Sequence, residues 1–506
     1  MRDSNLQIDQ QLTKSLLAAF EQCPRRLWLD MFRQTPALAG SAHQRLRAGQ
    51  QVGAFARSLV DGRYVATFDS AQALAKTAEL VAQADSAIFE AAFVYDDVLV
   101  RVDIMVPERH AGVVAWHVYE VKGSSSVKPY YVPDLATQLW IIEANGLTIA
   151  SASIRHLNSK FTLEQHGQYE GLFVDVDQHA PAKAITQNRA GLVAQAKAVL
   201  GTSEPIFATG AHCRNPHECN FIEHCQSTEP AGPLWPIADL PQTGTRLAAK
   251  WAEQGVYDIC DLPEDAGLSV QHERIRQAVK TGLPFHDHVG FAAELANCVY
   301  PYIWLDFETI AFAIPRWLGT RPFEQIPFQF SAHVEQANGH VDHVEALDLS
   351  GDDPCEQLAA ALAKLPGEGT VFAWYKSAEA TALKTLARRV PKHADALHSL
   401  VARLVDPLVL TKAYYYHPLQ RGSYSIKYVL PSLLPELSYD RLAIADGMMA
   451  QAAYMEAIES GCHSARKAEI ETQLREYCGQ DTWAMKLVCS KLSTPRETDN
   501  LSVTGE

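Results

Sequence analysis

Two apolar, β-rich runs of this sequence each enclose a carboxylate. The first, VRVDIMV at residues 100–106, contains Asp103, and the second, AWHVYEVKG at residues 115–123, contains Glu120 followed by Lys122. Residues two apart in a strand share a face, so Glu120 and Lys122 point the same way, and Asp103 can meet Glu120 if the runs pair. An unpaired carboxylate inside an apolar run would be costly. The pattern therefore favours a buried acidic site over a surface hairpin with an incidental ion pair.

Two carboxylates beside one ammonium suit a hard divalent cation. The acids would bind Mg²⁺ or Mn²⁺, and the lysine would position or activate an attacking water. Downstream, VPDLATQLWIIEANG at residues 132–146 predicts a helix with Asp134 near its start and Gln138 one turn later. Glu90, in the preceding run, is a further acid that could lie on the same sheet, and a solvated edge position is an equal alternative for it.

This order of a strand aspartate, a Glu-x-Lys and a helix with a glutamine resembles the PD-(D/E)XK nuclease core of the RecB family. The resemblance implies that Asp103 and Glu120 bind metal. It also implies that Lys122 assists the water and that Gln138 steadies the site. Many members of the family have a tyrosine four residues after the glutamine, where Ile142 stands here.

Three evenly spaced cysteines follow this region. The segment HCRNPHECNFIEHC, at residues 212–225, contains Cys213, Cys219 and Cys225 with five residues between neighbours. Thiolates clustered in a polar loop typically bind Zn²⁺ or an iron–sulfur cluster. The spacing differs from the two-residue gap of zinc ribbons, which favours the cluster, whereas the three histidines in the segment keep zinc as an alternative.

A fourth cysteine, Cys23, lies in an early predicted helix. One cysteine before the nuclease core and three after it resembles the iron–sulfur nucleases of the RecB family, including the CRISPR adaptation nucleases. That resemblance implies a [4Fe-4S] cluster that joins the two ends of the domain through Cys23, Cys213, Cys219 and Cys225. The other cysteines are scattered and mostly have apolar neighbours, which favours buried packing roles; they are Cys260, Cys298, Cys355, Cys462, Cys478 and Cys489.

A second acidic strand is predicted near residue 300. In YPYIWLDFETI, at residues 300–310, Asp306 and Glu308 share one face of a strongly apolar run. Burying this pair without a cation would be expensive. Two metal ions about 4 Å apart are the usual arrangement for phosphodiester cleavage. A strand-end turn with exposed acids is the alternative.

Two later segments carry further candidates. GTVFAWYKSAEATALKTLA, at residues 369–387, predicts a strand and then a helix with Glu379 in its first turn. A long final helix at residues 465–489 places Tyr477 and Asp481 four residues apart, hence on one face.

This order resembles the DnaQ-like, RNase H-fold exonucleases of the DEDD type over about residues 301–492. The resemblance implies that carboxylates hold two metal ions and that Tyr477 orients the attacking water. The implied metal ligands are Asp306, Glu308, Glu379 and Asp481. Most members have aspartate where Glu379 stands. Asp406 is an alternative third acid, which we interpret as a structural turn residue.

The length of 506 residues predicts more than one domain. We predict an α/β protein with a PD-(D/E)XK restriction-endonuclease-like domain at residues 1–228 and an RNase H-like domain at residues 298–492. A proline-rich linker and a helical spacer, weakly similar to a helix-hairpin-helix unit, would occupy residues 229–297. A disordered tail would occupy residues 493–506.

The composition of the sequence limits the classes of protein to which the chain can belong. The sequence is 47% apolar and 20% charged, as in soluble globular proteins. It contains no apolar run near the roughly 20 residues of a membrane span and no signal-peptide core at its N-terminus, so we expect a cytoplasmic protein. The net charge of −15 argues against a general polyanion binder, but nucleases bind through local basic contacts.

We therefore expect a two-headed, Mg²⁺- or Mn²⁺-dependent nuclease whose second head is a 3′→5′ exonuclease. Its partner would be nucleic acid, with DNA favoured, in repair or in defence against mobile DNA. Whole-chain similarity suggests an uncharacterised bacterial family with this domain pairing. The alternative is a nucleic-acid-binding scaffold in which one or both heads do not cut and the metal–cysteine site is structural.

Overall fold

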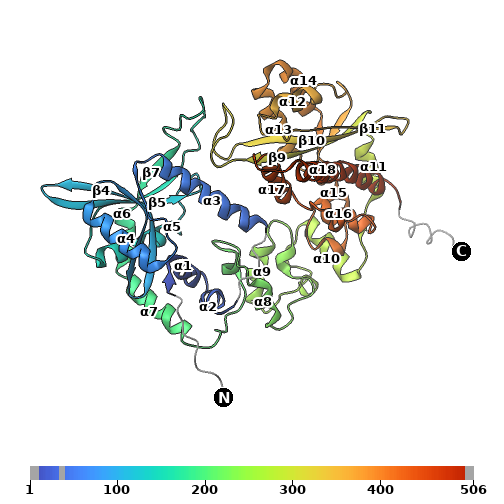
Figure 1. Ribbon diagram of the computed structural model, residues 1–506. Coiled ribbons are helices and arrows are strands. Elements are labelled where there is room, and N and C mark those ends of the chain that lie inside the picture. The colour runs from blue at the N-terminus through green and yellow to red at the C-terminus, as the bar shows by residue number, and fades with distance from the viewer. Residues whose placement is uncertain (1–10, 34–39, 496–506) are drawn as a thin grey trace. The chain divides into compact units, whose positions relative to one another are not determined.

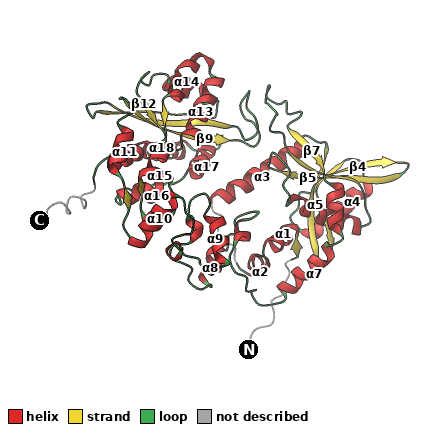
Figure 2. Cartoon of the chain, turned by 180° about the vertical axis from the view of Figure 1, so that it is seen from behind, coloured by secondary structure: helices red, strands yellow, loops and turns green. Residues whose placement is uncertain are grey.

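The computed structural model describes residues 11–33 and 40–495, and the chain divides into two compact units. The first unit comprises residues 1–230 with 312–323, and the second comprises residues 231–311 and 324–506. Each unit contains a mixed sheet with helices, which confirms the predicted α/β class (Figures 1 and 2). Of the predicted tail, residues 496–506 lie outside the described residues.

The first unit is built on a seven-stranded mixed sheet. Six strands follow the order β2-β3-β4-β5-β6-β7, and β1 pairs with β4 in parallel. Neighbours β3–β4, β4–β5 and β6–β7 are antiparallel, whereas β2–β3 and β5–β6 are parallel. The strands are β1 (Leu12–Thr13), β2 (Gly62–Tyr64), β3 (Ala87–Tyr95), β4 (Val98–His110), β5 (Val113–Lys122), β6 (Thr148–Leu157) and β7 (Phe173–Asp177).

Two tight turns set the register of the central strands. Asp96 and Asp97, between β3 and β4, both have positive φ, as do Ala111 and Gly112 between β4 and β5. Two-residue turns with φ above zero at both positions match the twist of a hairpin. The runs around Asp103 and Glu120 therefore become adjacent antiparallel strands.

Helices cover both faces of this sheet. Buried side chains of α1, α4, α5 and α7 join β3–β6 in one large core, and Ala56 of α3 joins a smaller cluster with Phe89 and Ile104. The helices are α1 (Lys14–Gln22), α2 (Pro24–Phe32), α3 (Gly40–Ser58), α4 (Ser70–Gln83), α5 (Tyr131–Ala144), α6 (His179–Thr186), α7 (Arg189–Leu200) and α8 (Ile222–Ser227), with a 3₁₀ turn η1 (Ala211–Arg214).

The second unit contains a five-stranded sheet in the order β11-β10-β9-β12-β13. Strand β10 is antiparallel to both of its neighbours, β11 and β9, whereas β9, β12 and β13 run parallel to one another. The strands are β9 (Tyr302–Ala311), β10 (Gln325–Glu335), β11 (Val341–Leu347), β12 (Thr370–Phe372) and β13 (Leu404–Val405). A separate antiparallel pair joins β8 (Phe285–His286) to β14 (Tyr415–Tyr416).

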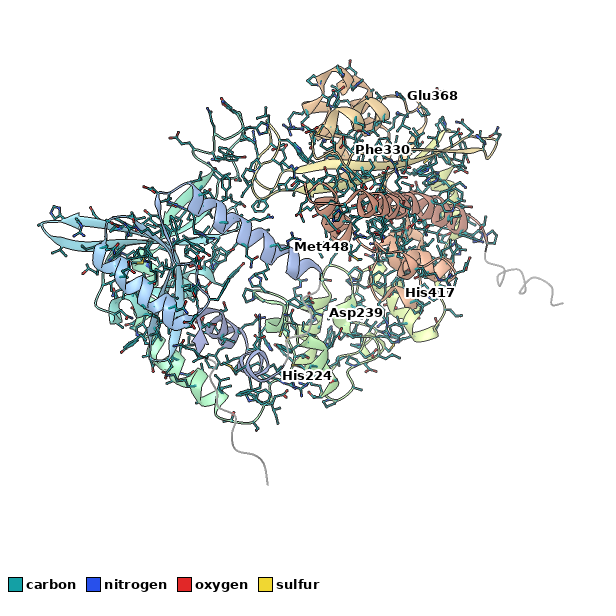
Figure 3. The ribbon with its side chains drawn as sticks, viewed as in Figure 1. His224, Asp239, Phe330, Glu368, His417 and Met448 are labelled. Carbon is teal, nitrogen blue, oxygen red and sulfur yellow. The ribbon has the colours of Figure 1, made fainter. Side chains whose placement is uncertain are left out.

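Strand β9 lies at the centre of this sheet and is covered on both faces. Residues Tyr302, Ile303, Trp304 and Leu305 are all buried, as expected for a continuous apolar strand between two layers. Helix α13 contacts β9 from one side and α17 and α18 contact it from the other (Figures 1 and 2). Phe330 of β10 is buried in the same sheet (Figure 3).

Among its described residues, the second unit has ten α-helices besides its strands. They are α9 (Gly244–Ala252), α10 (Val270–Thr281), α11 (His288–Leu295), α12 (Cys355–Leu362), α13 (Lys376–Arg389), α14 (Ala394–Ala402), α15 (Pro407–Tyr414), α16 (Ile426–Leu433), α17 (Gly447–Ala457) and α18 (Ser464–Leu492). The segment predicted as a spacer supplies α9–α11 and groups with this unit from residue 231 onward. Among the described helices, none combines the length and the apolarity that crossing a membrane would require.

Candidate functional sites

The β4–β5 hairpin brings Asp103 next to Glu120. Ile104 pairs with Tyr119, so continuing the same register places the two acids opposite each other, and the amide of Val121 donates to Asp103 Oδ2 at 2.7 Å. Lys122 Nζ lies 2.9 Å from Glu120 Oε1. Gln138 of α5, fully buried, donates through Nε2 to Glu120 Oε2. The structure thus gathers all four residues that the sequence assigns to the first site.

Charge at this site is uneven. Burial, together with the neighbouring Glu120, raises the pKa of Asp103 to about 7. Burial would also raise the pKa of Glu120, but Lys122 and Lys14 outweigh it and hold this pKa below its ordinary value. Burial would lower the pKa of Lys122, whereas Glu120 and Asp134 raise it above the ordinary range. Both carboxylates thus favour the charged form of Lys122.

Three partners of this site were not assigned to it from the sequence. Lys14, the first residue of α1, lies with Nζ 2.6 Å from Glu120 Oε1. Asp134 Oδ2 accepts from Lys122 Nζ at 2.8 Å, and the Tyr131 ring lies 4.9 Å from the same ammonium. The placement of Asp134 at the start of the glutamine helix was a usable signal. Nothing in the sequence links Lys14 to residues about a hundred positions away.

The pairing of β3 with β4 is interrupted where the acids lie. Glu90 has φ of 55°, in the left-handed region, and the β3–β4 ladder passes from Phe89–Ile104 to Ala91–Val102 without pairing Glu90 and Asp103. Such a conformation costs energy in a residue other than glycine and gathers at functional sites. Arg57 Nη1 donates to Glu90 Oε1 at 2.8 Å. Glu90 is therefore ion-paired on the sheet, next to Asp103.

The four cysteines predicted as ligands line one small cavity of the first unit, together with polar side chains that include Arg26 and His212 and a few apolar ones. Cys23 is the junction between α1 and α2, and the other three come from the segment at residues 212–225. Burial raises the pKa of both Cys219 and Cys225, and the other thiols of the group add to the increase. Residues about 190 positions apart thus converge as the sequence suggested.

The nearby histidines are partly engaged elsewhere. His224, labelled in Figure 3, lies with Nε2 2.9 Å from Glu204 Oε1, and the His217 ring packs against Tyr130. His212 approaches a cysteine, with Nε2 3.5 Å from Cys213 Sγ. Gln22 Nε2 donates to the carbonyl oxygens of both His212 and His217, which ties the end of α1 to the cysteine segment.

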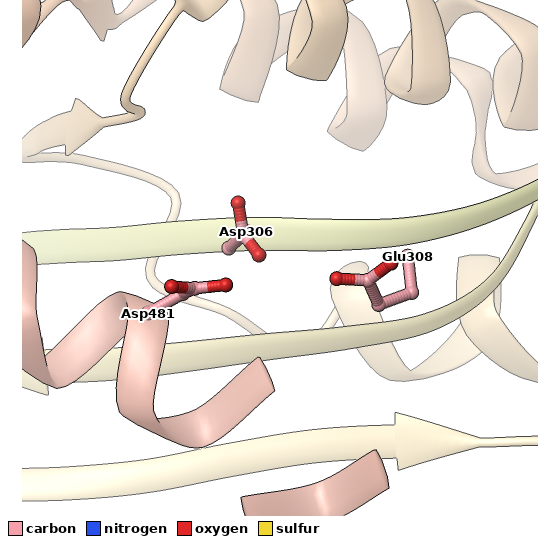
Figure 4. Close-up of side chains that lie close together, drawn as sticks. All are labelled: Asp306, Glu308 and Asp481. Carbon is pink, nitrogen blue, oxygen red and sulfur yellow. The ribbon is translucent and has the colours of Figure 1, made fainter. Parts of the chain in front are cut away.

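The second unit contains a tight carboxylate group. Asp306 and Glu308 of β9 and Asp481 of α18 each offer one oxygen within 4.8 Å of the others (Figure 4). Glu308 and Asp481 are 7% and 9% exposed. Burial raises the pKa of Asp306 and of Glu308 well above the ordinary value, and repulsion among the carboxylates adds to it. Three acids whose charges repel in a buried space form a site that a divalent cation would stabilise.

Tyr477, one turn before Asp481 on α18, lies beside this group. Lys427 of α16 donates from Nζ to Tyr477 Oη at 3.1 Å, and Tyr439 Oη donates to Asp481 Oδ1 at 2.6 Å. The positive charge of Lys427 opposes the rise in pKa of Asp306 and Asp481. Lys427 and Tyr439 escaped the sequence analysis because their segments have no strand or helix pattern tied to the acids.

Glu379 lies near this group but outside it. It occupies the first turn of α13, is 5% exposed, and lines a small pocket with Phe307, Thr309 and Gln325. Burial, followed by repulsion from the three acids, raises its pKa well above the ordinary value. Asp406 caps α15 and accepts from the amides of Tyr375 and Lys376, in agreement with a structural role.

Without a bound cation, the second unit should lose stability as the pH rises. Burial raises the pKa of Asp481 from 3.8 to about 6, so the folded protein binds more protons than the unfolded chain between these values. The unfolding free energy of the protein should therefore fall by about 3 kcal/mol as the pH rises through this range, because of Asp481 alone. Urea denaturation in EDTA at pH 4 and pH 7 measures this. The Asp481→Asn variant should lack that part of the decrease, and an identical slope in both proteins would contradict the assignment.

Comparison with known proteins adds one family model. The model, described as a domain of unknown function (DUF2779), matches residues 303–425. The matched segment includes Asp306, Glu308 and Glu379 and ends before Tyr477 and Asp481. No curated protein matches the chain.

Proposed function

We propose that this protein is a metal-dependent nuclease with two phosphodiester-cleaving sites. The observation that carries the proposal is the group of Asp306, Glu308 and Asp481, whose oxygens converge within 4.8 Å in a buried space. Buried like charges at this distance are unfavourable unless protonated or neutralised. Carboxylate oxygens are the ligands that Mg²⁺ and Mn²⁺ prefer, and phosphodiester hydrolysis is a reaction that such ions support.

The second unit is proposed as an RNase H-like, DnaQ-type exonuclease with 3′→5′ polarity. Its support is a central strand bearing Asp-x-Glu, faced by the last helix with Tyr477 and Asp481, which is the arrangement the resemblance implies. The first unit is proposed as a PD-(D/E)XK domain because Asp103, Glu120, Lys122 and Gln138 meet on one hairpin and its following helix.

The residues of each site would act as follows. The ions of the first site would be held by Asp103 and Glu120. Those of the second site would be held by Asp306, Glu308 and Asp481, with Glu379 a further carboxylate nearby. Gln138 fixes one oxygen of Glu120, and Lys122 holds positive charge where the phosphate would lie. Tyr477 would orient the attacking water. A bound divalent cation would polarise the phosphate and lower the pKa of that water.

We also propose that Cys23, Cys213, Cys219 and Cys225 hold a [4Fe-4S] cluster. The cavity that the four cysteines line together supports a shared group, and the lack of the two-residue gap typical of zinc ribbons favours the cluster over zinc. Its role would be structural, because it would join α1 and α2 to the segment at residues 212–225. We propose nucleic acid, with DNA favoured, as the substrate and the cytoplasm as the location.

The proposal is tested with Asp103→Ala and Asp306→Ala on labelled single- and double-stranded DNA and RNA in Mn²⁺. Each variant should lose the products of one site and keep those of the other. The scaffold alternative gains support from the position of Glu379 outside the acid group. The scaffold alternative is correct for the second unit if Asp306→Ala changes neither the amount nor the pattern of products while the protein still binds nucleic acid.

Tyr477→Phe should slow the second site by about 10²-fold, since positioned proton-transfer and water-orienting groups contribute at least this much. The affinity for Mn²⁺ should change much less than the rate, because the hydroxyl contacts Lys427 and Asp481 but is not one of the converging oxygens. Single-turnover digestion and Mn²⁺ titration measure the two effects. Tyr428→Phe, on the exposed side of α16, is the matched control. Equal rates for both variants would exclude this role for Tyr477.

A further inference from the structure

Two ammonium groups share one carboxylate oxygen at the first site. Glu120 Oε1 lies 2.6 Å from Lys14 Nζ and 2.9 Å from Lys122 Nζ. The other oxygen, Oε2, accepts from Gln138 Nε2. Each carboxylate oxygen has two lone pairs in its plane. Glu120, 2% exposed, therefore has little acceptor capacity left for a cation.

A divalent cation that binds Glu120 must therefore displace a donor. Lys122 is held three times, by Glu120, by Asp134 at 2.8 Å and by the ring of Tyr131. Within the described residues, Glu120 is the only ion-pair and hydrogen-bond partner of Lys14 Nζ. Lys14 is thus the donor that leaves most easily.

The backbone at Lys14 is fixed, so its side chain can move alone. Leu12 and Thr13 pair with β4 immediately before it, and the Thr13 hydroxyl caps α1 by accepting from Leu16. Leu17 of the same helix is buried in the core. A lysine carries its ammonium on a flexible four-carbon stem, which allows several ångströms of movement at fixed backbone. The Lys14 side chain is 19% exposed and so has a route to solvent.

We propose that Lys14 is a displaceable counterion of the first metal site, which neutralises Glu120 until a divalent cation binds and then binds a phosphate oxygen of the nucleic acid. The inference rests on the proposed function of this site. It assigns to Lys14 a role that differs from that of Lys122, which keeps its place throughout. The substrate phosphate is drawn to the freed ammonium because both lie beside the same bound ion.

The inference predicts opposite changes in two affinities. In the full chain carrying Asp306→Asn, so that the first site dominates, Lys14→Met should bind Mn²⁺ at least about 10-fold more tightly in calorimetry without nucleic acid. Removing a charge-assisted competitor is worth this much. The same variant should bind a DNA oligonucleotide about 10-fold more weakly in Ca²⁺. Lys14→Arg, which keeps the charge, should bind both much as the parent does.

The matched control is Lys76→Met, which removes the same charge from an exposed ion pair with Glu79 on α4 and should leave both affinities unchanged. Unchanged or weaker Mn²⁺ binding by Lys14→Met overturns the inference and leaves Lys14 a plain structural ion pair. Tighter Mn²⁺ binding with unchanged DNA binding overturns the phosphate role. If Asp103→Asn and the parent bind Mn²⁺ alike, the proposed first metal site fails and the inference fails with it.

Discussion

Asp306→Asn should lower the rate of the proposed 3′→5′ exonuclease by about 10³-fold or more, equivalent to about 4 kcal/mol of transition-state stabilisation. Asp306 lies on the central strand, and its oxygen converges with those of Glu308 and Asp481 (Figure 4). Asparagine keeps the size of the side chain but removes the charge that would hold a cation. Release of labelled nucleotide from a 3′ end, in a chain whose first site carries Asp103→Asn, measures the effect.

Stability separates this loss from misfolding. Burial and mutual repulsion raise the pKa of Asp306 and Glu308. The charged forms of these acids are therefore unfavourable in the cation-free protein. Asp306→Asn should therefore keep or raise the melting temperature in EDTA. The control Asp342→Asn changes a 59% exposed acid on β11 and should retain full activity. Full activity of Asp306→Asn would refute the assigned metal site.

The second large effect concerns the cysteines. Cys219→Ser should remove bound iron and destabilise the first unit by about 2–5 kcal/mol, as does the loss of a native cross-link, which corresponds to a fall of about 10 °C in melting temperature for a unit of this size. Cys219 is only half-buried, so the change to serine costs little packing. Iron and sulfide analysis with calorimetry of anaerobically purified protein measures both effects.

A cysteine outside this group supplies the comparison. Cys260, in the 3₁₀ turn η3 (Ile259–Asp261) of the second unit, is also half-buried, and Cys260→Ser should leave metal content unchanged. The anaerobically purified wild-type protein should be brown, with absorbance at about 400 nm. Stoichiometric zinc without iron would show that the site binds zinc instead of the proposed cluster. Equal metal content in both variants and the wild type would contradict the proposal that these cysteines bind a metal cluster.

The sequence predicted the residues whose pattern is local. Acids within two neighbouring apolar runs predicted that Asp103 and Glu120 would meet if the runs paired, and helical spacing predicted that Tyr477 and Asp481 share one face. Apolar strands that carry acids are unusual enough to stand out from the rest of the chain. These signals need no knowledge of tertiary structure.

The residues that were missed come from elements with no local signal. Lys14 reaches Glu120 from the first turn of α1, and Lys427 reaches the Tyr477 hydroxyl from the first turn of α16, so the packing of those helices is needed to reveal the contacts. Glu379 has the predicted place in its helix, yet its side chain lies outside the tight acid group, since spacing along the chain does not fix the direction of a side chain across a sheet. Likewise, the segment predicted as a spacer has its own buried apolar cluster that includes Tyr416 and Tyr424, residues far along the sequence.

The central claim is that buried carboxylates in both units bind divalent cations to cut phosphodiester bonds. Its most direct test is digestion of end-labelled DNA and RNA by the wild-type full chain and by the Asp103→Asn/Asp306→Asn double variant, each in Mn²⁺ and in EDTA. We predict cleavage by the wild type in Mn²⁺ alone and none by the double variant. Intact substrates in every wild-type reaction, or equal cleavage by the double variant, would contradict the account.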